Sequence, residues 1–447
     1  MNTRLRLGAL TTAVLASCSP AAYGARTPRS DAERLHAAVQ TVTDVMVYDI
    51  MSPPQASRVY AYAGIAAYEA MRPGFPAYRS LAGQVNGLTP PPAPNGEVSY
   101  PLAGVHAYLA VGRTLTFSRA RMDSLRTARD DEFHRTGMSD AVFARSVAYG
   151  DTVAKHVLAW AGKDHFLQTR GAPKFTVSQD PSRWVPTPPA YMDAVEPHWG
   201  DIRPFVMDSS SQFRPEPPFK FDTAKGSPYF REVMEVYDIR RTITDEQRGI
   251  AAFWDCNPYV MHVQGHTMFA TKKISPGGHW MGIVKLAARQ SNADIMRSAD
   301  AYARTSMALA DGFISGWAEK FHSNMIRPET VINRYVDEAW EPLLQTPPFP
   351  DYVSGHSLIS AAAATVLTDA FGPNFAFVDS SEARYGLPAR TFPSFAAAAD
   401  EAALSRLYGG IHFRRSNEQG KVIGRQIGAL IVERVHTHAG ATVAQRR

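Results

Sequence analysis

Three separated segments of the sequence combine cationic side chains, histidines and small residues in a pattern that suits binding of an anion. The residues are Lys320, Arg327, Ser354, Gly355, His356, Arg406 and His412. Lys320 and Arg327 are seven residues apart, which on one helix would place both side chains on nearly the same face. Ser354 stands where a helix N-cap is expected, so free backbone N–H groups should cluster beside His356. Together the segments supply three cations and two imidazoles.

A tetrahedral oxyanion is the ligand that these side chains favour. Buried cations are costly unless solvent or an anion carries the opposing charge. Both guanidinium groups, the amide of Gly355 and the hydroxyl of Ser354 would donate hydrogen bonds to the oxygens of such an anion. One histidine would then approach the central atom, while the other transfers protons near its ordinary pKa of about 6.5. Each residue alone is more typical of a surface charge or a structural histidine, so the interpretation requires all three segments to converge.

The elements that must position these residues are helices. Apolar residues recur at helical spacing and the pattern often stops at proline or glycine. Helices are expected at 31–51, 55–71, 101–117, 118–136, 139–162, 228–240, 244–255, 279–290, 293–322, 355–371, 394–407 and 417–437. Strand alternation is scarce throughout. The predicted fold class is therefore all-α, built from helical bundles.

The predicted organisation is an export segment, 1–24, followed by two helical halves, 25–225 and 226–447. Prolines and scattered aromatic residues are concentrated between about 164 and 224. Such a segment suits either a long ordered excursion on the surface or a linker between the halves. The sequence alone leaves both interpretations open.

The first residues resemble an export signal. Arg4 and Arg6 precede the apolar stretch 7–17, which is too short to span a bilayer. Residues 15–18 (Leu-Ala-Ser-Cys) resemble a lipobox that would attach a lipid at Cys18, and this is favoured over ordinary cleavage after 22–24 (Ala-Tyr-Gly). We therefore expect an exported chain, either periplasmic or anchored to a membrane as a lipoprotein.

Composition excludes several classes of protein. The chain has 447 residues, 45% of them hydrophobic, which is typical of a folded globular protein. Its net charge of +5 is spread along the chain, so no nucleic-acid partner is expected. Beyond the signal no apolar run is long enough to cross a membrane. Loss of Cys18 would leave Cys256 alone, expected to be a small buried side chain in a protein without an intramolecular disulfide. The oligomeric state is not indicated.

The three segments resemble the signature shared by vanadium-dependent haloperoxidases and the acid phosphatases of the PAP2 superfamily, closely from about 317 to 420. Upstream, 254–259 (Trp-Asp-Cys-Asn-Pro-Tyr) and 278–280 (Gly-His-Trp) resemble the bacterial haloperoxidases, particularly secreted iodoperoxidases. Trp317 also matches the haloperoxidase pattern. The resemblance implies two four-helix bundles packed together, with one vanadate per chain bound in the C-terminal bundle.

The resemblance also implies a role for each matching residue. The vanadate oxygens would be held by Lys320, Arg327, Ser354, Gly355 and Arg406. His412 would bind vanadium axially, and the catalytic residues would be Lys320 and His356, with His356 as the acid/base. Position and resemblance together suggest Trp317, Tyr259 and Ser357 as candidates to line the pocket for halide and peroxide.

Two positions depart from the family pattern. Val353 stands where most members have proline before Ser-Gly-His, and Ser416 stands where aspartate often follows the last histidine by four residues. That aspartate commonly supports the second ring nitrogen of the vanadium ligand, and such partners tune ligand basicity. The partner of His412 is therefore open, with Asn417 or a backbone carbonyl as candidates.

Haloperoxidase activity is the favoured function. The enzyme would oxidise a halide, iodide or bromide in preference, with hydrogen peroxide to hypohalous acid, while Lys320 polarises the reacting oxygen. One alternative is a secreted PAP2-type acid phosphatase in which His412 attacks phosphorus to give a phosphohistidine and His356 protonates the leaving alcohol. A second alternative is a non-catalytic surface lipoprotein that binds an oxyanion without turnover.

His262 and His266 are four residues apart and would face one metal ion only if that stretch is helical. Ordinary structural histidines are the favoured interpretation.

Overall fold

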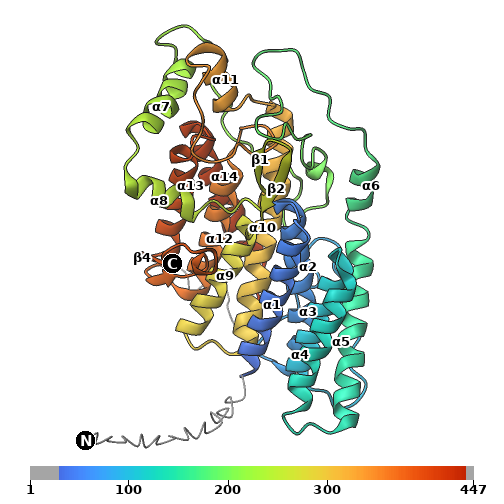
Figure 1. The fold of residues 1–447 in the computed structure, drawn as a ribbon. Helices are drawn as coiled ribbons and strands as arrows, with labels where there is room; N and C mark the ends of the chain where they lie inside the picture. Colours follow the sequence, from blue (N-terminus) through green and yellow to red (C-terminus); the bar gives the residue numbers. More distant parts are fainter. Residues whose placement is uncertain (1–29, 439–447) are drawn as a thin grey trace, which may run out of the picture.

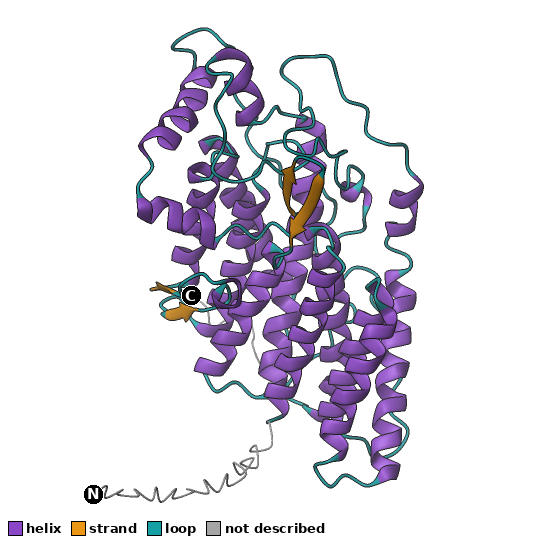
Figure 2. Cartoon of the chain, in the orientation of Figure 1, coloured by secondary structure: helices purple, strands orange, loops and turns teal. Residues whose placement is uncertain are grey.

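The computed structural model describes residues 30–438, and the chain in this range is mainly helical with four short strands (Figures 1 and 2). The predicted signal segment 1–24 and its Cys18 lie outside the described residues. No helix in the described range combines the length and the apolar character that a membrane crossing requires.

The first half of the chain forms a bundle of long helices followed by one short helix, drawn from blue to green in Figure 1. Its helices are α1 (Asp31–Tyr48), α2 (Pro53–Met71), α3 (Tyr100–Leu115), α4 (Arg119–His134), α5 (Asp140–Ala161) and the short α6 (Phe166–Gly171). Serine N-caps begin α1, α2, α3 and α5, each accepting a hydrogen bond from a backbone amide in the first turn,. The sequence predicted all of these helices except α6.

The second half forms the remaining helices, drawn yellow-green to red in Figure 1. They are α7 (Pro228–Thr242), α8 (Asp245–Phe253), α9 (Pro276–Gln290), α10 (Ile295–Ser323), α11 (Pro328–Tyr335), α12 (Gly355–Phe371), α13 (Phe395–Tyr408) and α14 (Arg414–Arg434). Helix α10 packs against both α2 of the first bundle and α12 of the second. The all-α bundle architecture is confirmed, whereas the division of the chain at residue 225 stays a prediction.

Helices α12 and α14 approach each other very closely. A Cβ atom built on Gly424 would lie 2.1 Å from the backbone oxygen of Leu358, and one on Gly420 would lie 2.9 Å from that of Ser354. Glycine at these positions lets the two backbones touch. The start of α12 is thereby held against the first turns of α14, which follow His412 directly.

The proline-rich segment between α6 and α7 is an ordered excursion and not a free linker. Its side chains Trp184 and Trp199 are buried, and the carboxylate of Asp311 on α10 accepts hydrogen bonds from three consecutive amides, residues 205–207, at 2.6–3.1 Å. The excursion is therefore fixed to the helix that carries Trp317 and Lys320.

Two antiparallel hairpins were not predicted from the sequence. They are β1 (Val260–Gln264) with β2 (Thr267–Thr271), and β3 (Phe377–Asp379) with β4 (Arg390–Phe392). His262 lies in β1 and His266 in the tight turn that follows. The helical spacing that a metal pair would need is therefore absent, and His262 instead contacts the Thr271 hydroxyl at 2.9 Å.

Candidate functional site

Lys320 and Arg327 enter the site from the C-terminal end of α10. Helix α10 ends at Ser323 because Asn324 takes a left-handed conformation, with φ of 47°,. Arg327 is therefore the N-cap of α11, and the expectation that both cations share one helix face is wrong. They converge nonetheless, because the Lys320 ammonium and the Arg327 guanidinium each lie 5.1 Å from the ring centre of Phe349.

Both cations are fully buried and are held by backbone carbonyls. Lys320 Nζ donates to the carbonyl oxygens of residues 350 and 351, both at 2.9 Å. Arg327 donates through Nε to the oxygen of Phe349 at 2.8 Å and through Nη1 to that of Ile411 at 2.7 Å. These bonds fix the side chains, but a neutral carbonyl group does not neutralise either positive charge.

The second segment forms the start of α12, as predicted. Ser354 is the N-cap, and its Oγ accepts a hydrogen bond from the amide of Ser357 at 3.4 Å. A Cβ on Gly355 would lie 3.4 Å from the ring of Trp317, so glycine places the helix start directly beside that indole. The free amides of this first turn, with the helix dipole, form an electropositive surface next to His356.

The third segment brings Arg406 from the end of α13 and His412 from the turn that follows. Gly410, with φ of 76°, turns the chain there. Arg406 Nη1 donates to the carbonyl oxygen of Trp254 at 2.7 Å, and Nη1 of Arg327 lies 3.1 Å from Nε2 of His412. The first and third segments therefore meet directly.

Asp351 answers the question of which residue supports His412. Its carboxylate oxygen lies 2.8 Å from His412 Nδ1, while the Ser416 hydroxyl is 3.4 Å from the same nitrogen and donates to the Asp351 carbonyl at 3.1 Å. Asn417, expected as a substitute, instead accepts from the Ser357 hydroxyl at 3.1 Å. Sequence reasoning missed Asp351, although it lies in the segment that includes Ser-Gly-His and is three residues from Ser354.

The donors left without partners fit an oxyanion. Lys320, Arg327 and Arg406 are buried, whereas in the described part of the chain only two carboxylates lie within 4 Å of the two guanidinium groups, Asp351 beside Arg327 and Asp255 beside Arg406, each at 3.9 Å. Among the described residues, Arg327 Nη2, Arg406 Nε and His356 Nε2 have no hydrogen-bond partner. Unpaired buried donors are expensive, and a tetrahedral oxyanion would satisfy them and neutralise the excess charge. The residues present therefore fit vanadate.

The surroundings of both histidines lower their pKa values. Burial is the main cause that lowers the pKa of His412 well below its ordinary value, followed by Arg327 and Lys320. Burial, with Arg406 next, lowers the pKa of His356 in the same way. Burial also lowers the pKa of Arg327 to about 10. An anion bound among these groups would raise all of these pKa values, so that His356 could hold a proton for transfer.

A cavity of about 470 Å³ opens onto Gly355, His356, Arg406 and His412. Its walls are mostly apolar and include Trp317, Tyr259 and Phe349 beside His356 and His412. The Trp317 indole is fixed by a 3.1 Å hydrogen bond to a carbonyl oxygen of the excursion, residue 195. Two of the three expected pocket residues, Trp317 and Tyr259, therefore line the cavity.

Ser357, the third residue expected in the pocket, does not line this cavity. It is fully buried, and its hydroxyl lies within hydrogen-bond distance of Ser354 Oγ, at 2.9 Å, and of Asn417 Oδ1, at 3.1 Å. Ser357 therefore supports the N-cap from behind.

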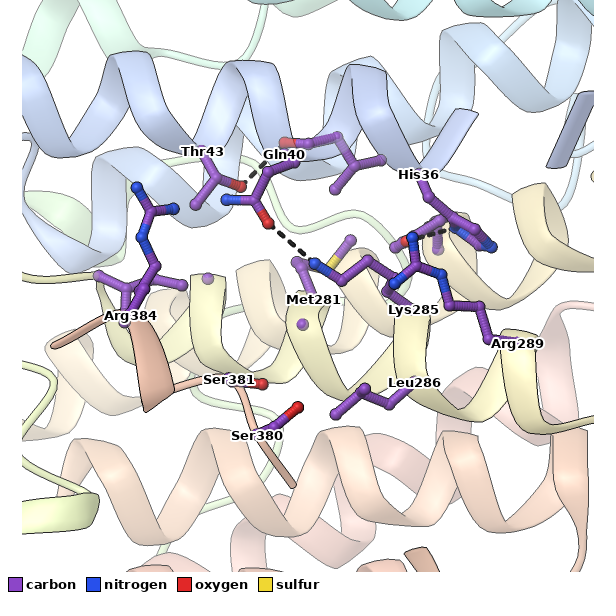
Figure 3. Close-up of a pocket in the computed structure, with 15 residues that line it drawn as sticks. His36, Gln40, Thr43, Met281, Lys285, Leu286, Arg289, Ser380, Ser381 and Arg384 are labelled. Atoms are coloured by element: carbon purple, nitrogen blue, oxygen red, sulfur yellow. Dashed lines mark hydrogen bonds between the residues drawn. The ribbon is translucent and has the colours of Figure 1, made fainter. Parts of the chain in front are cut away.

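A second cavity, of about 230 Å³, lies between α1, α9 and the segment 380–384 (Figure 3). It is also basic, but its arginines already have carboxylate partners: Arg289 pairs with Glu33 at 2.6 Å and Arg384 with Asp44 at 2.5 Å. Lys285 reaches across it to the amide oxygen of Gln40, at 2.9 Å. This cavity lacks the unpaired arginine donors of the first one.

The structure is similar to the crystal structure of the first bacterial vanadium-dependent iodoperoxidase, with a TM-score of 0.87 and 50% sequence identity over 92% of this chain and 98% of that one. This chain belongs to the vanadium-dependent haloperoxidase family. A family model described as the VCPO second helical-bundle domain matches residues 300–441 of this haloperoxidase, the part that contains Lys320 to His412. No curated protein matches the chain.

The fold of this haloperoxidase is also shared by a bacterial vanadium-dependent chloroperoxidase in apo and holo forms. Both structures are 17% identical and cover 86% of this chain and 94% of theirs, with TM-scores of 0.64 and 0.61. At that identity the likeness concerns the fold alone.

Proposed function

We propose that this haloperoxidase binds vanadate and oxidises iodide, in preference to bromide, with hydrogen peroxide to hypoiodous acid. The observation that carries the proposal is a set of three buried cations, two of them with unpaired donors, together with the buried His412 and the partly buried His356. One of these cations, Arg406, and both histidines line an apolar cavity. The iodide preference is supported by the 50% identity to a bacterial iodoperoxidase.

The binding roles follow from the unpaired groups. Arg327 Nη2, Arg406 Nε and the amide of Gly355 would donate to the vanadate oxygens, with the Ser354 hydroxyl and the Lys320 ammonium beside them. His412 would bind vanadium through Nε2, because Asp351 lies against Nδ1. A carboxylate at that nitrogen fixes the tautomer and raises the basicity of the ligand.

Bound vanadate supplies an electrophilic centre at which hydrogen peroxide becomes a two-electron oxidant for halide. The net reaction, iodide plus hydrogen peroxide plus a proton giving hypoiodous acid and water, consumes one proton. His356 Nε2 is unpaired and lines the cavity, so it would move that proton. Lys320 would stabilise negative charge on the oxygen atom that receives this proton. The apolar wall formed by Trp317 and Phe349 would strip water from the entering halide.

Reconstitution tests the proposal. Protein stripped of vanadate should oxidise iodide with peroxide only after vanadate is added, more slowly with bromide, and phosphate should compete with vanadate. Turnover of phosphate esters without halide oxidation would support the phosphatase instead. Binding of vanadate with no turnover of either kind would support a non-catalytic oxyanion-binding protein.

We further propose that the chain is exported and anchored by a lipid at Cys18, on the basis of the lipobox-like sequence at residues 15–18. Mass spectrometry of the mature N-terminus should find a diacylated Cys18, and Cys18→Ser should move the protein from the membrane fraction to the periplasm. A mature chain beginning after Gly24 would indicate ordinary cleavage and a free periplasmic enzyme.

A further inference from the structure

A buried group of potential metal ligands lies behind the vanadate site, outside the residues that the proposed function uses. Cys256, His279 and Glu382 place a thiol sulfur, an imidazole nitrogen and a carboxylate oxygen within 4.8 Å of one another. They come from three distant parts of the chain: the loop after α8, the first turns of α9 and the connection between β3 and β4. The tertiary fold alone brings them together.

The separations match those between ligands of one tetrahedral metal ion. His279 Nδ1 lies 3.2 Å from Cys256 Sγ and 3.4 Å from Glu382 Oε1. Zinc binds sulfur at about 2.3 Å and imidazole nitrogen or carboxylate oxygen at about 2.0–2.2 Å, so tetrahedral neighbours lie about 3.4–3.6 Å apart. The observed distances are at or just below this range.

The second nitrogen of His279 is held as in many metal sites. Its Nε2 lies 2.7 Å from Oδ2 of Asp379, and both side chains are fully buried. A carboxylate on one imidazole nitrogen is the usual partner of a histidine that binds metal through the other, because it fixes the tautomer and orients the ring. The Trp254 indole stacks on the same ring, with centres 4.6 Å apart at 16°.

Glu382 supplies the independent sign of a missing cation. Its side chain has no exposed surface, and among the described residues neither carboxylate oxygen has a hydrogen-bond partner. Its one ion pair in that range is with His279, whose charge Asp379 already shares. Two nearby cations, Lys273 before α9 and Arg406 on α13, lie near Asp255, at 3.7 and 3.9 Å, and form no such pair with Glu382. A divalent ion would compensate the buried carboxylate.

We propose that a divalent transition metal ion is bound by Cys256, His279 and Glu382, and that Asp379 orients His279. The types of donor atom indicate that the ion is zinc. A thiolate, an imidazole and a carboxylate form a borderline-soft donor set that suits zinc and excludes magnesium or calcium. Three protein ligands leave one coordination position for water.

The metal ion would take no part in halide oxidation. It would instead hold residues near the vanadate site in position. Trp254, which covers His279, accepts the hydrogen bond from Arg406 Nη1 at 2.7 Å, and Cys256 itself lines the main cavity. A metal ion would fix residues 254–256, and with them the guanidinium that is proposed to hold vanadate. This consequence rests on the proposed function, whereas the metal site itself does not.

Metal analysis tests the site without any assay of halide oxidation. Untagged full-length protein, purified without chelators and without added vanadate, should contain about one zinc per chain. Cys256→Ser and His279→Gln should each lose it, and the conservative Glu382→Gln should weaken zinc binding by at least tenfold. His262→Gln, which removes a partly buried histidine of β1 that contacts Thr271 and is not one of the three proposed ligands, should keep full zinc content.

Cobalt substitution of the wild-type protein keeps the test informative if a variant fails to fold. Cobalt should give a thiolate-to-metal charge-transfer band in the near ultraviolet, absent from Cys256→Ser, and should protect Cys256 from alkylation. Folded wild-type protein that binds neither zinc nor cobalt, or zinc retained in folded Cys256→Ser, would overturn the proposal and leave a metal-free ion pair. Vanadate binding that persists in a zinc-free protein would contradict only the positioning role.

Discussion

The unpaired donors of Arg406 give a quantitative prediction for vanadate binding. Within residues 30–438, Nη1 donates to the Trp254 carbonyl, Nε has no partner, and Nη2 has only Asp255 at 3.9 Å. Two donors are therefore available to an anion. A hydrogen bond to a charged group contributes about 1.5–3 kcal/mol, so removal of both costs about 3–6 kcal/mol. Because each 1.4 kcal/mol corresponds to about a tenfold change in affinity, Arg406→Met should raise the Kd for vanadate by about 10²–10⁴-fold.

Isothermal titration calorimetry with vanadate measures this directly, and circular dichroism checks that the variant folds. Arg406→Lys should lie between the wild type and Arg406→Met, because it keeps the charge and loses the planar fork. Arg425→Met removes an arginine on the exposed face of α14 and should leave the Kd unchanged. A folded Arg406→Met that binds vanadate within about threefold of the wild type would refute the reasoning, since that is under 1 kcal/mol.

Three further outcomes are expected. His356→Gln should lower kcat for iodide oxidation by about 10²–10⁴-fold, while the affinity for vanadate changes by less than about tenfold. A variant that loses vanadate affinity by the same factor as kcat would contradict a proton-transfer role for His356. Gly424→Ala should lower the free energy of urea unfolding by at least about 1–3 kcal/mol, because its Cβ would lie 2.1 Å from a backbone oxygen of α12, whereas Gly249→Ala, with open space around it, should not. Burial lowers the pKa of His36 from 6.5 to about 4. Between these two pH values the unfolded chain binds a proton at His36 and the folded chain does not. The free energy of unfolding should therefore fall by up to about 3 kcal/mol as the pH drops from 6.5 to 4. In His36→Gln that fall should be smaller, and an identical pH profile would contradict the assignment.

The helices were predictable because their signals are local. Ser354 begins α12 at the predicted residue, and α10, predicted at 293–322, forms at Ile295–Ser323 with its apolar residues from Ile295 to Trp317 buried. The types of residue in the site were equally visible, since three cations and two histidines occur in short segments. Membership of the family then follows from 50% identity to the iodoperoxidase over most of the chain.

What could not be predicted depends on contacts between distant residues or on one backbone angle. Asn324 ends α10 before Arg327 through a positive φ, which spacing alone does not reveal. The hairpin that holds His262 overrides a helical spacing of histidines because its strands pair with each other,. Asp351 supports His412 from 61 residues away in the chain, and Glu382 meets Cys256 only in the folded protein.

A crystal structure of the vanadate-loaded protein, with an anomalous difference map for vanadium, tests the central claim most directly. The predicted map has one vanadium peak per chain at bonding distance from His412 Nε2, with Arg327 Nη2 and Arg406 Nε each within hydrogen-bond distance of a vanadate oxygen. A peak bonded elsewhere, or those two arginine nitrogens still without partners in the loaded protein, would contradict it.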